Sequence, residues 1–154
     1  MDYMTVKWIH ILSSTLLLGT GLGIAFFMWM AHLSRDARYI ANTARLVVIA
    51  DTIFTAPAVI VQFLSGVWMV HYLGMPYSVF WVKWSLVLFF VIGACWLPVV
   101  WLQIQARNLA QKAADNAEPL PKIYSTLMRW WFWLGWPAFI SVIIIFWMMV
   151  HKPG

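Results

Sequence analysis

The chain has 154 residues, of which 64% are hydrophobic and 10% are charged, with a net charge of +5. Soluble domains carry about 25% charged residues, so the composition excludes a soluble globular domain. It also excludes a nucleic-acid-binding module, because the basic residues form no stripe on a soluble face. The length suffices for four membrane spans of about 20 residues each, which predicts a single transmembrane domain over residues 1–154.

Four apolar segments predict an all-α, integral membrane four-helix bundle. In chain order they cover roughly residues 5–31, 46–73, 80–104 and 130–150. Prolines inside the last three segments, at positions 57, 98 and 137, are expected to kink the helices and free backbone carbonyls. The connection over residues 74–79 is short and rich in turn residues, so the second and third segments should be antiparallel neighbours.

The basic residues predict the orientation. The connection over residues 74–79 has no Lys or Arg, whereas the first and third connections carry Arg35, Arg38, Arg45, Arg107, Lys112, Lys122 and Arg129. The positive-inside rule places these two connections in the cytoplasm. We therefore expect a multi-pass protein of a bacterial inner membrane, with both termini outside.

His10 is the first candidate for a functional residue, because an ionisable group inside hydrocarbon is costly. It shares a helical face with Ser14 and Gly21, whose small bulk leaves room for a flat ligand. Gly19 and Gly23 form a G-x-x-x-G on a neighbouring face. We interpret this spacing first as a helix-packing motif, which makes a homodimer plausible.

The second segment carries a polar stripe that should face the bundle interior, formed by Asp51, Thr55, Gln62 and Ser65. Asp51 and Gln62 are candidates for an internal polar path. Asp51 either relays protons or forms a salt bridge with Arg45, Arg107 or His32. His71 lies on the opposite side of this helix, although at the same depth as His10.

These residues favour haem b as the cofactor, in electron transfer or a small redox reaction. His10 would be one axial ligand and His71 the first candidate for the second, with Lys83 as a contact to a propionate or to a substrate. Copper is an alternative, because imidazoles lie at the level of the thioethers of Met69, Met75, Met148 and Met149. A cofactor-free accessory or structural subunit is a third possibility. Enzymatic activity stays open, with an oxidoreductase as its expected form.

The sequence also resembles known families. The runs KWIHILSSTLLLGTGLGIAFF (7–27), ADTIFTAP (50–57) and LGWPAF (134–139) resemble a bacterial family of four-helix predicted integral membrane proteins of unknown function. K-x-x-H-I at residues 7–11 and Trp81-Val82-Lys83 are similar to HemJ-type protoporphyrinogen oxidases and related copper-resistance membrane proteins. This resemblance implies haem b, with His10 and Lys83 as the functional pair. Asp51 and the tryptophan-rich third segment depart from it, so it does not imply protoporphyrinogen oxidation.

Overall fold

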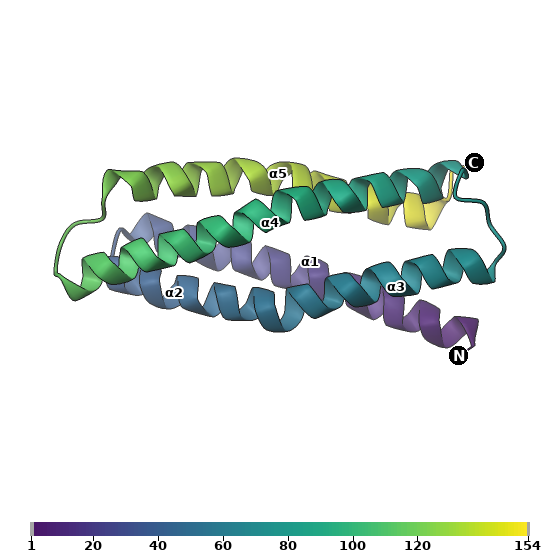
Figure 1. The fold of residues 1–154 in the computed structure, drawn as a ribbon, viewed down its shortest axis with the longest axis horizontal. Coiled ribbons are helices and arrows are strands. Elements are labelled where there is room, and N and C mark those ends of the chain that lie inside the picture. The colour runs from purple at the N-terminus through teal and green to yellow at the C-terminus, as the bar shows by residue number, and fades with distance from the viewer. Residues whose placement is uncertain (1, 154) are drawn as a thin grey trace.

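The computed structural model describes residues 2–153, and in these residues the chain forms long helices without strands (Figure 1). The helices are α1 (Tyr3–Ser34), α2 (Ala37–Ala50), α3 (Ala56–Tyr72), α4 (Phe80–Asp115) and α5 (Lys122–His151). A π-helical turn, η1 (Asp51–Thr55), joins α2 to α3 in one continuous rod. All four rods are long and apolar enough to cross a membrane, which confirms the predicted all-α four-helix membrane bundle.

The helices are longer than predicted at the end that carries the basic connections. The first connection shrinks to Arg35 and Asp36, and the third to residues 116–121. Hydropathy locates only the apolar part of a helix, whereas these extra turns are amphipathic. In α2, for example, Ile40 and Ala44 are buried while Arg45 is exposed. The Asp36 side chain accepts a hydrogen bond from the Tyr39 N–H at 2.9 Å and caps α2.

The apolar core lies in this same half of the bundle, where α2 packs on α1 and α4, and α4 packs on α5. Many of its members are alanines, whose small side chains allow the helices to approach closely. The largest fully buried apolar side chains are Met28, Ile40, Tyr124 and Met128. This well-packed half holds the four rods together and leaves the other half free to form a site.

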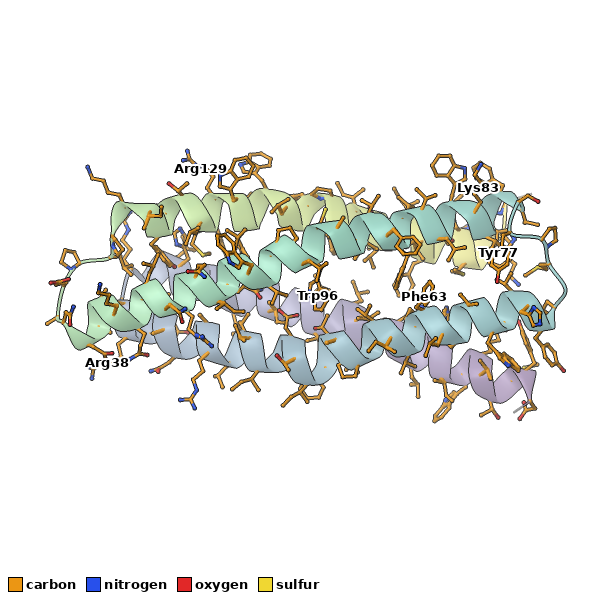
Figure 2. The ribbon with its side chains drawn as sticks, in the orientation of Figure 1. Arg38, Phe63, Tyr77, Lys83, Trp96 and Arg129 are labelled. Atoms are coloured by element: carbon orange, nitrogen blue, oxygen red, sulfur yellow. The ribbon has the colours of Figure 1, made fainter. Side chains whose placement is uncertain are left out.

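The two ends of the bundle differ in charge. Both termini and the connection between α3 and α4 lie at one end (Figure 1). Arg38 and Arg129 lie at the opposite end, far from Tyr77 and Lys83 (Figure 2). This separation is what the predicted orientation requires, and the side of the membrane that each end faces stays a prediction. We call the half with the termini the terminal half, and the other the basic half.

Candidate functional site

The His10 side chain bridges α1 and α3 in the terminal half. Its ring Nδ1 lies 2.8 Å from the Ser65 Oγ, and its Nε2 lies 2.9 Å from the Gln62 Nε2. The amide oxygen of Gln62 in turn accepts a hydrogen bond from the Ser13 hydroxyl, one turn along α1. These four residues, His10, Ser13, Gln62 and Ser65, form what we call the His10 cluster.

The hydroxyl of Ser65 determines where the protons of the ring lie. It donates its one hydrogen to the Val61 carbonyl at 2.6 Å, so its oxygen is left to accept from the Nδ1–H of His10. The ring Nε2 then carries a lone pair, which accepts a hydrogen bond from the Gln62 amide nitrogen. A neutral imidazole with its proton on Nδ1 therefore satisfies both neighbours.

The same cluster also suits a protonated ring. If the Gln62 amide turns by half a rotation, its oxygen accepts from the Nε2–H and its nitrogen donates to the Ser13 oxygen. The Ser13 hydroxyl then donates to the His10 carbonyl, which already lies 3.0 Å away. Both ring nitrogens are therefore paired in each protonation state, and the change requires only that the Gln62 amide and the Ser13 hydroxyl turn.

Gly66 allows this arrangement because α3 presents no side chain to the ring at that position. A Cβ atom on Gly66 would lie 3.2 Å from the Cε1 and 3.8 Å from the Nδ1 of His10. The first distance is shorter than ordinary van der Waals contact. The imidazole is therefore held between the backbone of α3 and its two hydrogen-bond partners.

A small cavity of about 70 Å³ lies beside the ring, between the α1/α3 pair and the α4/α5 pair. His10 and Gln62 line one side of it, and apolar side chains such as Phe89 and Met149 line much of the rest. Ser85 on α4 also lines the cavity, and its side chain is only 6% exposed. The Ser85 hydroxyl has no hydrogen-bond partner, which is rare for a buried polar group.

The other residues predicted for this site lie outside the cavity. His71 and Lys83 are exposed and do not line it, so the structure does not bring His71 to His10. The ammonium group near the cavity belongs instead to Lys152, whose Nζ lies 5.9 Å from the ring centre of Trp81. His71 was predicted at the same depth as His10, but it lies on the other side of α3 from Gln62, so the two histidines are not neighbours.

Ser14 and Gly21 share a face with His10 by residue spacing, but they do not contribute to the cluster. Ser14 donates to the carbonyl of Ile11 in its own helix at 2.7 Å. Gly21 is exposed, and a Cβ atom there would meet nothing within 4 Å. Ser13 reaches the cluster instead, because it lies on the side of α1 that faces Gln62 of α3.

A second polar cluster lies in the middle of the bundle, at the turn η1. The Asp51 carboxyl accepts a hydrogen bond from the indole N–H of Trp96 at 3.2 Å. With the Gln103 amide turned so that its nitrogen faces Asp51, which pairs both ends of the amide, the carboxyl also accepts from that nitrogen at 2.8 Å. The Gln103 oxygen accepts from the indole of Trp131 at 3.2 Å. Figure 2 shows Trp96 pointing from α4 toward the rod formed by α2, η1 and α3. We call this set the Asp51 cluster.

None of the salt bridges expected for Asp51 is among these contacts. Arg45 is exposed, the Arg107 guanidinium donates to Asn108, and the ring of His32 lies 3.3 Å from the Tyr124 hydroxyl. Asp51 and Gln62 also belong to different clusters. They are eleven residues apart, which is roughly 16 Å along a helix, so they form no direct hydrogen-bonded path.

Comparison with known proteins identifies the family. The model of the family described as predicted integral membrane protein (DUF2269) matches residues 4–153. The chain belongs to this family. No curated protein and no solved structure matches it. Membership confirms the expected family and the integral membrane class, and the description names no activity, so function has to be argued from the two clusters.

The haem implied by the HemJ resemblance can be tested against the geometry of this DUF2269 protein. An axial imidazole needs a free ring nitrogen, and both nitrogens of His10 are hydrogen-bonded to α3. Pockets for small-molecule ligands span about 300–1,000 Å³, whereas the cavity beside His10 has about 70 Å³. In this arrangement the residues do not fit a haem. Within residues 2–153, no three His, Cys, Asp or Glu side chains are placed to hold a metal ion.

Several residues of the two clusters and of the cavity beside His10 were not predicted from the sequence. Ser13 precedes the serine that the spacing favoured, and Gly66 and Ser85 carry no distinctive pattern. Gln103 did offer a signal, because it is an uncharged polar residue within the apolar third segment, where lipid cannot satisfy an amide. No sequence pattern distinguished Trp96 and Trp131 from the other tryptophans of the chain, which has twelve in all.

Proposed function

We propose that this protein binds and releases protons at His10 within the membrane. The observation that supports this most directly is the His10 cluster, in which a turn of the Gln62 amide and the Ser13 hydroxyl gives both ring nitrogens a partner in each protonation state. Histidine is suited to this task, because its unperturbed titration falls between about pH 5 and 8. We place the protein in a bacterial inner membrane, with the His10 cluster in the outer half.

The cavity is the route by which protons reach the ring. Its volume of about 70 Å³ exceeds the 10–15 Å³ or so that one water requires. The unpaired Ser85 hydroxyl offers a water in that space a partner opposite His10 and Gln62. Among residues 2–153, no Lys, Arg, Asp or Glu lines the cavity, so His10 is the group there that can carry a charge.

NMR of the protein with ¹⁵N-labelled histidine in detergent or lipid tests this function. We expect the His10 ring, identified by its loss in His10→Gln, to change from the Nδ1–H tautomer to the doubly protonated form within about pH 5 to 8. Gln62→Glu should keep the ring doubly protonated over that range, because a carboxylate next to Nε2 can only accept. A ring that stays neutral or charged throughout, or a neutral ring protonated on Nε2, would refute the proposal.

Proton flux into vesicles tests the consequence. Protein reconstituted with an entrapped pH-sensitive dye should conduct protons under an imposed gradient, and His10→Gln should lower the rate toward that of protein-free vesicles. His71→Gln is the matched control, because His71 is exposed outside the cavity. Equal rates for wild type and His10→Gln would count against proton transfer through His10.

Haem b ligation by His10, for electron transfer or a small redox reaction, is the second candidate. Its support is the resemblance together with the position of His10 in an aromatic-lined gap between two helix pairs, which includes Phe63, Trp81 and Phe89. It would require the Gln62 amide to leave Nε2 and the gap to widen. A Soret band that shifts on reduction and is lost in His10→Ala would establish it. Stoichiometric copper in a colourless protein would establish the copper alternative. If neither haem nor copper is found, proton binding remains the proposal.

A further inference from the structure

Asp51 lies in a local distortion of the rod formed by α2, η1 and α3. Residues Asp51–Thr55 form the π-helical turn η1, in which the amide of Ala56 donates to the carbonyl of Asp51. π-Helical turns are rare in proteins, and those that occur are often found at functional sites. Asp51 and Thr55 are four residues apart and both lie on the inner face of the rod, where their side chains are 4% and 8% exposed. The turn therefore has a carboxyl group and a hydroxyl group together in the middle of the bundle.

The donors around the carboxyl are fixed in place. The Gln103 side chain is 1% exposed, and its oxygen accepts from the Trp131 indole, which leaves only its nitrogen to face Asp51. The Trp96 indole occupies the other carboxyl oxygen at 3.2 Å. Each of the two carboxyl oxygens of Asp51 therefore accepts one hydrogen bond from a neutral donor.

Within residues 2–153, no Lys, Arg or His side chain is bonded to the Asp51 carboxyl. On its own rod Arg45 is exposed, and Arg107 on α4 donates to Asn108. On α5 Arg129 is exposed, and on α1 the His32 ring lies next to Tyr124. A carboxylate buried in hydrocarbon without a cation is strongly disfavoured against its neutral acid.

The neutral acid has a partner ready for its proton. A protonated carboxyl still accepts hydrogen bonds at both oxygens and gains one O–H donor. The Thr55 hydroxyl, which lies beside Asp51, makes no hydrogen bond of standard geometry in the structure. One added proton on the carboxyl, donated to the Thr55 oxygen, would give this hydroxyl the partner that it lacks.

We propose that Asp51 is a second proton-binding site of the protein, which holds a proton as a neutral carboxylic acid hydrogen-bonded to Thr55 and exchanges it with water. This site is independent of the His10 cluster, since the two clusters share no residue and lie roughly 16 Å apart along the helix axis. Together they place titratable groups at two depths of the membrane. The proposal therefore stands or falls separately from proton binding at His10.

Infrared spectroscopy of the full-length protein in lipid tests it. The carbonyl stretch of a protonated carboxyl is separate from that of carboxylates and amides, and the chain has only five Asp and Glu side chains. Asp51 is the one among them within the buried part of the bundle. We expect a carboxylic acid band at neutral pH that shifts in D₂O, decreases at alkaline pH and is lost in Asp51→Asn.

Three controls make the test decisive. Asp36→Asn should keep the band, because Asp36 lies at the exposed end of α2. Thr55→Val should keep it but move it to higher frequency, because the O–H loses its acceptor. Protein labelled with ¹³C at the aspartate carboxyl should shift the band without any substitution, which covers an Asp51→Asn that fails to fold. Absence of the band at neutral pH, or a band unchanged by D₂O and by alkaline pH, would overturn the proposal.

Discussion

Gly66→Ala probes the contact between α3 and the His10 ring with the smallest possible change. The new methyl group would lie 3.2 Å from the ring Cε1, so the ring has to move by a few tenths of an ångström or α3 has to shift. Either movement lengthens the hydrogen bonds to Ser65 and Gln62, which now measure 2.8 and 2.9 Å. The substitution therefore acts on the His10 cluster without removing any of its polar groups.

Two opposing contributions set the magnitude. Replacing glycine by alanine inside a helix stabilises it by about 1 kcal/mol. Leaving a buried donor or acceptor unpaired costs about 1–3 kcal/mol. Gly93 on α4 is the matched control, because it also lies inside an apolar helix and a Cβ atom there would meet nothing within 4 Å. We expect Gly66→Ala to be less stable than Gly93→Ala by about 1–3 kcal/mol.

Reversible unfolding in mixtures of dodecyl maltoside and dodecyl sulfate measures this difference, with helicity followed by circular dichroism. The ¹⁵N resonances of His10 should change in Gly66→Ala and stay the same in Gly93→Ala. If both variants gain the same stability and leave the His10 resonances unchanged, the ring is not held against α3 and the geometry of the cluster is wrong.

Three further predictions concern other parts of the molecule. Ser85→Ala should leave the free energy of unfolding unchanged or raise it by about 1 kcal/mol, because the hydroxyl has no partner. The same substitution should lower the proton flux into vesicles. A clear loss of stability would show that the hydroxyl has a partner in the folded protein. The Thr5 hydroxyl and N–H donate to the Asp2 carboxylate and hold its pKa below the ordinary value. Because the folded pKa is the lower one, this cap stabilises the first turn of α1 above the unfolded pKa and is lost as the pH falls through the folded pKa. The protection of the Thr5 amide, measured as its exchange rate relative to that of an unstructured peptide at the same pH, should therefore fall in acid, and in Asp2→Asn this protection should not depend on pH. A Cβ atom on Gly19 or Gly23 would meet nothing within 4 Å in the single chain. Gly23→Leu should therefore shift a homodimer toward monomer in cross-linking and leave the fold intact. Unchanged cross-linking would place the interface elsewhere.

The four-helix membrane bundle followed directly from the sequence, because runs of apolar residues without charges have few alternatives to spanning helices. His10, Gln62 and Ser65 could also be selected from the sequence, since polar groups within apolar segments must find partners inside the protein. The ends of the helices in the basic half could not be predicted in this way. Their polar faces look like loops to any measure of hydropathy, although their alanine-rich faces are buried.

The partners of these residues depend on how the helices are rotated and packed, and residue spacing along one helix contains no such information. Packing places Gln62 and Ser65 at the two nitrogens of His10 and leaves His71 exposed on the other side of α3. It also brings Gln103 and Trp96 from α4 to Asp51, in place of the arginines that the charges favoured. The sequence by itself determined that buried polar groups exist and at which depths. Only the tertiary structure decided which of them meet, because contacts between helices depend on how the helices are rotated and packed against one another.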